Sequence, residues 1–129
     1  MAMATNEPHI TWPESGMYKV VQLSIDGKPL LAFDDINHGN ILANFLKKFG
    51  IDFKVLENRL RERVPAIEGE RYKVLGAGKA VIDAESRKAY FWDKSAGYGV
   101  SISEEHVNEI RKLYADWVIK SDPSKTPQQ

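Results

Sequence analysis

Residues 17–33 read MYKVVQLSIDGKPLLAF, two β-rich runs joined by Asp26-Gly27, and the hairpin that they predict organises the rest of the chain. In the first run, alternate residues point to the same side of a strand, which groups Lys19 with four apolar residues on one face. An Asp-Gly pair between two such runs is a strong signal for a tight hairpin turn. Pro29 cannot donate a hydrogen bond to a neighbouring strand, so we expect the second strand at the edge of a sheet.

The rest of the chain predicts helices on either side of a group of strands. Apolar residues recur at helical spacing over Gly39–Phe49 and stop before Gly50, which is typical of a C-terminal cap. Residues 52–64 also suit an amphipathic helix, and Ser103 is placed to cap a last helix. Strand-like runs lie between them, at Tyr72–Leu75, Lys79–Asp83 and Arg87–Trp92. Strands gathered by short turns favour an α+β fold, a mostly antiparallel sheet with two or three helices packed against it.

The composition excludes several classes of protein. The 129 residues include 18 basic and 18 acidic side chains, so no net charge would attract nucleic acid or an anionic membrane. The lack of cysteine excludes disulfide scaffolds, thiolate zinc sites and cysteine nucleophiles. No apolar run approaches the ~18 residues of a membrane span, and no signal-peptide pattern is present. We expect a cytoplasmic monomer with one domain over 14–120, a flexible N-terminal arm (1–13) and a disordered tail (121–129).

His38 is the histidine best placed for chemistry, because it lies directly before a predicted helix. The first turn of a helix offers unpaired N–H groups that suit a phosphate. The same positive end disfavours the imidazolium, so a neutral His38 could act as a base or a nucleophile near pH 7. The alternative is that His38 only caps the helix through Nδ1. His9, in the arm, and His106, in the first turn of the last helix, are expected at the surface.

Two segments with small residues could bring backbone N–H groups to an anion. Residues 75–81, LGAGKAV, fit neither a Rossmann fingerprint nor a Walker A loop, so what remains is a glycine-rich loop followed by Lys79. The alternative there is a bulged strand with a surface lysine. Residues 94–99, KSAGYG, offer the Ser95 hydroxyl and open N–H groups, or form an ordinary strand-to-helix loop. With no HExxH or DxDxDG motif, we expect neither a metal nor a cofactor.

The order of these motifs along the chain is more specific than any one of them. A strand with a lysine is followed by a helix-opening histidine, a glycine strand, an aromatic strand, a serine loop and a last helix. Their positions are Gly16–Val20, Asn37–Ile41, Leu75–Lys79, Lys88–Trp92, Ser95–Gly99 and Ser103–His106. In this order the chain resembles the phosphohistidine phosphatase family, also called janus/ocnus, over about Ser15 to Ile119.

The resemblance implies a small metal-independent α+β enzyme that removes phosphate from phosphohistidine in proteins, or from a small phosphoramidate. His38 matches the catalytic histidine of the family, and would either activate water or take the phosphoryl group itself. The implied phosphate-binding set is Lys19, Asn37, Gly39, Lys79, Ser95, Ala96 and Gly97. Acidic residues such as Glu104 and Glu105 are expected to lie away from this pocket.

Two departures from the family pattern bear on the activity. Three glycines and an arginine are replaced here by Gly-Ala-Gly-Lys, and a lysine cannot form a bidentate contact with phosphate. Residues 51–71 look like an insertion, either a solvated helix or a contact for an acidic protein substrate. Its basic residues are Arg59, Arg61, Arg63 and Arg71. The alternatives are therefore a noncatalytic phosphate- or phosphopeptide-binding module, and a protein-interaction domain that uses a 53–64 helix.

Overall fold

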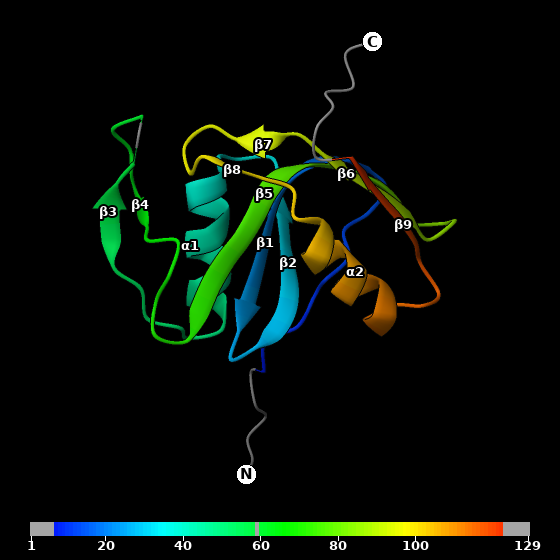
Figure 1. Ribbon diagram of the computed structural model, residues 1–129, viewed down its shortest axis with the longest axis horizontal. Helices are drawn as coiled ribbons and strands as arrows, with labels where there is room; N and C mark the ends of the chain where they lie inside the picture. The colour runs from blue at the N-terminus through cyan, green and yellow to red at the C-terminus, as the bar shows by residue number, and fades with distance from the viewer. Residues whose placement is uncertain (1–6, 59, 123–129) are drawn as a thin grey trace.

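A mixed sheet forms the centre of the computed structural model, which describes residues 7–58 and 60–122. It has five strands in the order β2-β1-β5-β6-β9, and every neighbouring pair is antiparallel except β6-β9 (Figure 1). The strands are β1 (Gly16–Ile25), β2 (Lys28–Asp34), β5 (Tyr72–Asp83), β6 (Lys88–Trp92) and β9 (Val118–Asp122). The expected α+β fold with a mostly antiparallel sheet is confirmed, and Pro29 does lie on an edge strand.

The two helices, α1 (His38–Lys48) and α2 (Glu104–Leu113), cover opposite faces of the sheet (Figure 1). The side chain of Gln22 accepts a hydrogen bond from the backbone of Ser103, directly before α2. Lys19 instead lines a pocket with His38, the first residue of α1. Because Lys19 and Gln22 are three residues apart on one strand, their side chains point to opposite faces. The start of α2 and the start of α1 therefore lie against opposite faces of the sheet.

The predicted helix over 52–64 is wrong, because this segment forms a hairpin of β3 (Val55–Glu57) and β4 (Arg63–Pro65). The Asn58 side chain explains the difference. Its Oδ1 accepts from the N–H groups of both Leu60 and Glu62, at 2.9 Å each, which turns the chain back on itself. Asparagine competes with helices in this way by offering the backbone a local partner. The proposed interaction through a 53–64 helix therefore has no structural basis.

Residues near both ends of the described chain contact the rest of the fold. Ile10 is buried in the core, and the Trp12 ring stacks on Trp117 with centroids 4.1 Å apart. Within the expected arm, Ile10 and Trp12 therefore pack against the rest of the fold. Ser121 and Asp122, expected in the tail, belong to β9. The remaining parts of the expected arm and tail, 1–6 and 123–129, lie outside the described residues.

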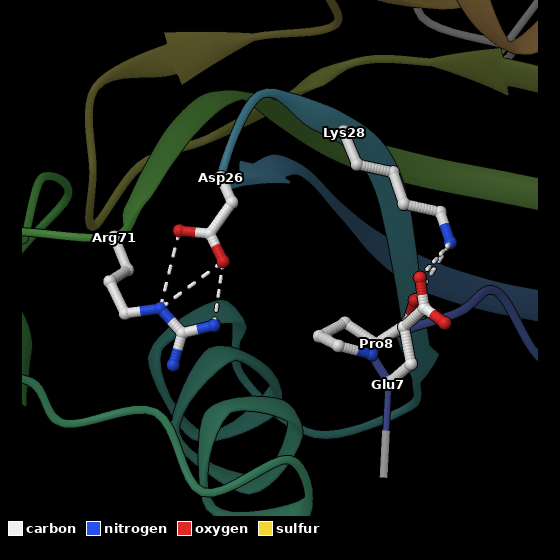
Figure 2. A network of polar contacts seen from close by, with 5 residues as sticks. All are labelled: Glu7, Pro8, Asp26, Lys28 and Arg71. Atoms are coloured by element: carbon white, nitrogen blue, oxygen red, sulfur yellow. Dashed lines mark hydrogen bonds and ion pairs between the residues drawn. The ribbon is translucent and has the colours of Figure 1, made fainter. Parts of the chain in front are cut away.

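Ion pairs join the β1–β2 turn to the rest of the chain (Figure 2). Arg71 donates to both carboxylate oxygens of Asp26, and its own carbonyl accepts from the Asp26 N–H at 2.7 Å. These hydrogen bonds from the guanidinium lower the pKa of Asp26. On the other side of the turn, Lys28 donates to the Pro8 carbonyl at 3.0 Å and lies 4.0 Å from Glu7. Arg71 is thus engaged within the fold, whereas Arg59 lies outside the described residues.

His106 is buried, so its expected position at the surface is wrong. Its side chain is 2% exposed and its Nε2 lies 3.0 Å from the Leu23 carbonyl oxygen. The other ring nitrogen faces the Gln22 amide at 3.4 Å. Burial lowers the pKa of His106, so the ring is held neutral. This histidine belongs to the contact between α2 and the sheet.

Candidate functional site

One pocket of about 350 Å³ at the N-terminus of α1 contains every residue that the sequence singled out for the site. Those residues are Lys19, Asn37, His38, Gly39, Lys79, Ser95, Ala96 and Gly97. They come from β1, from the start of α1, from β5, and from β7 (Lys94–Ser95) with the turn that follows it. The fold therefore brings together residues that lie up to 78 positions apart, from Lys19 to Gly97.

The orientation of His38 is set by a hydrogen bond to the sheet. Its Nε2 lies 2.8 Å from the carbonyl oxygen of Gly78, which can only accept, so Nε2 carries a proton. In the neutral ring the lone pair is then on Nδ1. Burial lowers the pKa of His38; the Gly78 hydrogen bond opposes this, and the charges of Lys19 and Lys79 add to it. A neutral ring whose Nδ1 has no hydrogen-bond partner in the described part of the chain is what a base or a nucleophile requires.

His38 is not the helix cap, so the alternative role considered for it is excluded. The cap is Asn37, whose Oδ1 accepts from the Asn40 N–H at 2.8 Å. Gly39 follows directly, and a Cβ at that position would lie 2.1 Å from a methyl carbon of Val64. The glycine therefore allows β4 to pack closely against the start of α1. These contacts leave His38 free to face the pocket.

The pocket is locally positive although the chain has no net charge. Among the described residues, three lysines line it, Lys19, Lys79 and Lys94, against one carboxylate, Glu62. A further acid, Asp93, lies 3.4 Å from the Lys79 ammonium. The expectation that the acids lie elsewhere is therefore wrong for Glu62 and Asp93. The lysines still outnumber the acids, so the electrostatic balance favours an anion.

The Ser95 turn presents a hydroxyl and backbone N–H groups. Ser95 is 2% exposed, and its Oγ accepts from the Tyr98 N–H at 3.3 Å, which leaves the hydroxyl proton free to donate. The Gly99 N–H closes the turn on the Ser95 carbonyl at 2.8 Å. Within 7–58 and 60–122, the N–H groups of Ala96 and Gly97 have no hydrogen-bond acceptor. The turn thus supplies donors suited to phosphoryl oxygens.

The wall of the pocket opposite the sheet was missed in the sequence, because it comes from the β3–β4 hairpin. Asn58 donates from Nδ2 to Glu62 Oε1 at 2.9 Å, and Asn37 reaches Glu62 Oε2 at 3.5 Å. A Cβ on Gly97 would lie 2.9 Å from Asn58 Nδ2, so the turn passes close to this wall at a glycine. The Tyr98 hydroxyl donates to the Pro65 carbonyl at 2.8 Å and fastens the turn to the hairpin.

The two glycines of LGAGKAV serve packing on the other face of the sheet. This segment is neither a flexible loop nor two strands, since β5 is continuous, with the expected bulge opposite Gln22 and Leu23. A Cβ on Gly76 would lie 2.6 Å from the Ser101 carbonyl oxygen, and one on Gly78 would lie 2.3 Å from that of Trp92. The glycines therefore let the chain cross closely over the sheet before α2. Their contribution to the pocket is the Gly78 carbonyl that holds His38.

Comparison with known proteins returns no assignment. No protein-family model matches the chain, and none of the curated proteins matches it significantly. Among the described residues, no three His, Cys, Asp or Glu side chains are grouped so that they could hold a metal ion. In the same part of the chain, no helix has the length and apolar character needed to cross a membrane.

Proposed function

We propose that this chain is a metal-independent phosphohistidine phosphatase, or phosphoramidate hydrolase, of the janus/ocnus type, with His38 as its catalytic residue. The observation that carries this proposal is the position of His38. Its Nε2 is held by the Gly78 carbonyl while the ring lines a pocket with Lys19 and Lys79. A neutral imidazole beside cations and free N–H donors suits attack on a phosphoryl group.

The reaction breaks the P–N bond of a phosphoramidate and forms a P–O bond with water. As a general base, Nδ1 of His38 takes a proton from the attacking water while the leaving nitrogen gains a proton. As a nucleophile, Nδ1 first forms its own P–N bond, and water then hydrolyses that intermediate to phosphate. Both routes use the same lone pair. Because a P–N bond is labile, a modest site is sufficient for either.

The charged and polar groups around His38 have a role common to both routes. The negative charge of the phosphoryl oxygens is redistributed as the P–N bond breaks, and fixed donors aimed at those oxygens stabilise the transition state. Lys19, Ala96 and Gly97 all line the pocket with His38, which supports this role for them. Lysine contacts are less directional than those of arginine, so we expect the N–H donors to define the orientation.

The test compares wild type with His38→Ala for hydrolysis of phosphoramidate. His9→Ala is the matched control, because His9 is exposed and lies outside the pocket. The proposal predicts turnover by wild type and by His9→Ala, and a loss of at least about 100-fold in His38→Ala. Amide NMR shifts with inorganic phosphate are measured in parallel. Shifts at Ala96 and Gly97 without turnover would indicate a noncatalytic phosphate-binding module. The absence of both shifts and turnover would refute phosphate binding in this pocket.

A separate experiment distinguishes the two routes. Wild type is mixed with phosphoramidate, quenched at alkaline pH and examined by mass spectrometry for a phosphorylated histidine peptide. A phosphoryl group on the peptide that contains His38 supports the nucleophilic route. Release of phosphate with no such species, in samples quenched within the first catalytic cycle and during steady turnover, supports the general-base route.

A further inference from the structure

A carboxylate lies in the wall of the anion pocket, where it opposes the lysines. Glu62, directly before β4, lines this pocket together with His38 and Gly97. Its Oε1 lies 3.8 Å from the point that a Cβ on Gly97 would occupy, beside the turn proposed to bind phosphate. Glu62 belongs to residues 51–71, the segment that looks like an insertion in the sequence, so the family resemblance implies no role for it. A negative charge in this position disfavours a free phosphate and suits a ligand that also carries a positive charge.

The Glu62 carboxylate is held in place from two sides. The Glu62 N–H donates to Asn58 Oδ1 and the Glu62 carbonyl accepts from the Asn58 N–H, at 2.9 Å each, which fixes the residue at the end of the turn. Asn58 Nδ2 donates to Glu62 Oε1 at 2.9 Å, and Asn37 Nδ2 lies 3.5 Å from Oε2. Asn37 is itself oriented, because its Oδ1 caps α1 through the Asn40 N–H. The plane of the carboxylate is therefore set before a ligand binds.

These partners leave the charge of Glu62 uncompensated. Both are neutral amides, and within residues 7–58 and 60–122 no lysine or arginine forms an ion pair with Glu62. A carboxylate has about four acceptor positions, so one amide on each oxygen leaves further positions open. A glutamine would accept from Asn58 equally well, so the turn does not require the charge. The charge and the open acceptor positions are available to a ligand.

A phosphorylated guanidine fits both parts of this pocket. Phosphorylation of one nitrogen leaves the positive charge on the other two, whose N–H groups lie in one plane away from phosphorus. A guanidinium forms two parallel hydrogen bonds with a carboxylate, and the opposite charges strengthen both. By contrast, the uncharged ring of a phosphohistidine has no N–H and presents a lone pair. A phosphorylated primary amine carries its charge on the nitrogen that is bonded to phosphorus.

We propose that Glu62 recognises the leaving group of a phosphorylated guanidine, such as a phosphoarginine side chain, and that this chain hydrolyses this class of substrate in addition to phosphohistidine. This inference rests on the proposed function. The phosphoryl group contacts the lysines and the N–H groups of the Ser95 turn, while the guanidinium pairs with both oxygens of Glu62. Glu62 is then a specificity residue for the leaving group and takes no part in breaking the bond.

The reaction consumes one water and no other reactant. The water oxygen bonds to phosphorus, the P–N bond breaks, and its electron pair stays with the nitrogen. One proton of the water ends on that nitrogen, directly or through His38, and the other stays on the phosphate. The products are inorganic phosphate and an unmodified guanidinium, so the leaving group is a cation both before and after the reaction. Glu62 can therefore hold it throughout.

The test measures kcat/KM for phosphoarginine and for phosphohistidine at pH 8, where an imidazole of ordinary pKa, about 6.5, is uncharged. Wild type, which should hydrolyse both substrates, is compared with Glu62→Gln, which keeps an oxygen for Asn58 and removes the charge. Because a charged hydrogen-bonded pair is lost, Glu62→Gln should be about ten- to 100-fold slower with phosphoarginine. With phosphohistidine it should equal or exceed wild type, and this turnover also shows that the variant is folded.

Glu57→Gln is the matched control, because it removes the same charge from an exposed position on the same hairpin, outside the pocket. It should change neither value by more than about two-fold. Parallel losses with both substrates in Glu62→Gln would mean that this side chain supports the pocket rather than the guanidinium. An unchanged rate with phosphoarginine would mean that Glu62 does not contact the leaving group.

Two further outcomes separate this inference from the proposed function. If wild type hydrolyses phosphohistidine but not phosphoarginine, the proposed function survives and the role of Glu62 is refuted. If wild type hydrolyses neither, both fail. A third substrate, ε-phospholysine, tests the guanidinium itself, since a loss in Glu62→Gln equal to that with phosphoarginine would show that Glu62 responds to charge alone and would overturn the assignment.

Discussion

Lys79 lies directly opposite Lys19 in the β1–β5 ladder, and only Lys79 has a carboxylate partner among the described residues, Asp93 at 3.4 Å. Two like charges side by side in a sheet disfavour each other unless a counterion joins them. Asp93 compensates for one of the two. The charge of Lys19 is therefore the less neutralised one and the stronger attraction for a phosphate.

Both lysines should contribute to phosphate binding, and the effect of removing Lys79 includes the release of Asp93. Lys19→Met should weaken inorganic phosphate binding by about ten-fold, whereas Lys79→Met, which also releases Asp93 into the site, should weaken it by a comparable or larger factor. The distinguishing variant is Asp93→Asn, which should strengthen binding by about three-fold by freeing Lys79. Titration calorimetry at low salt checks all three. Weaker binding in Asp93→Asn would contradict the assignment.

Glu62 is the carboxylate that faces the pocket, so its removal should favour an anion. Glu62→Gln keeps an oxygen that can accept from Asn58 and removes the charge. We expect inorganic phosphate to bind about three- to five-fold more tightly, with the largest effect at low ionic strength. Glu57→Gln, on the exposed strand of the same hairpin, is the control and should have little effect. Unchanged or weaker binding in Glu62→Gln would show that the carboxylate does not repel the ligand.

Substitution of Gly76 in β5 should lower the stability of the fold and leave phosphate binding unchanged. Gly76→Ala would bring a Cβ within 2.6 Å of the Ser101 carbonyl oxygen, which overpacks the crossing chain. We expect a decrease of about 1–3 kcal/mol in the free energy of unfolding, measured with denaturant. Phosphate affinity of the folded fraction should remain within about two-fold of wild type. Normal stability with lost phosphate binding would restore the view that this glycine approaches the anion.

The elements that the sequence predicted correctly are those with local signals. The β1–β2 hairpin and α1 were predicted because turn chemistry, edge proline and helical spacing are all local signals. The prediction of a helix over 52–64 was wrong. Its apolar residues have helical spacing, but the Asn58 side chain binds the backbone of Leu60 and Glu62 and stabilises a turn instead. His106 was misplaced because its partner Gln22 is 84 positions away. Burial created by distant segments leaves no local pattern.

The residues of the candidate site also differ in whether local sequence predicts their position. The position of His38 at the start of α1 was predicted from local sequence, whereas its convergence with Lys19, Lys79 and Ser95 was expected only from the order of motifs along the chain. Glu62 was missed because it belongs to a segment that was assigned to a helix. β9 was also not foreseen, since it pairs with β6 in parallel after the chain passes through α2.

The protonation of His38 predicts the pH dependence of turnover. Burial and the neighbouring lysines lower the pKa of His38, so Nδ1 keeps its lone pair to a pH below the ordinary histidine value of about 6.5. For wild type, kcat/KM should therefore fall on the acid side with a midpoint below about 6.5. In Lys19→Met, which removes one of those charges, the midpoint should move upward. Wild type and Lys19→Met are compared on the same substrate, so titration of the substrate affects both profiles equally. An unchanged midpoint in Lys19→Met would contradict the effect of Lys19 on the pKa of His38.

The most direct test of the central claim is a phosphorus-31 NMR time course with a histidine-phosphorylated protein and either wild type or His38→Ala. Wild type should convert the phosphohistidine resonance to inorganic phosphate, and His38→Ala should be slower by at least about 100-fold. The unfolding midpoint of the variant confirms that it is folded. Conversion by His38→Ala at the wild-type rate, or a wild-type rate equal to that of buffer alone, would contradict the account.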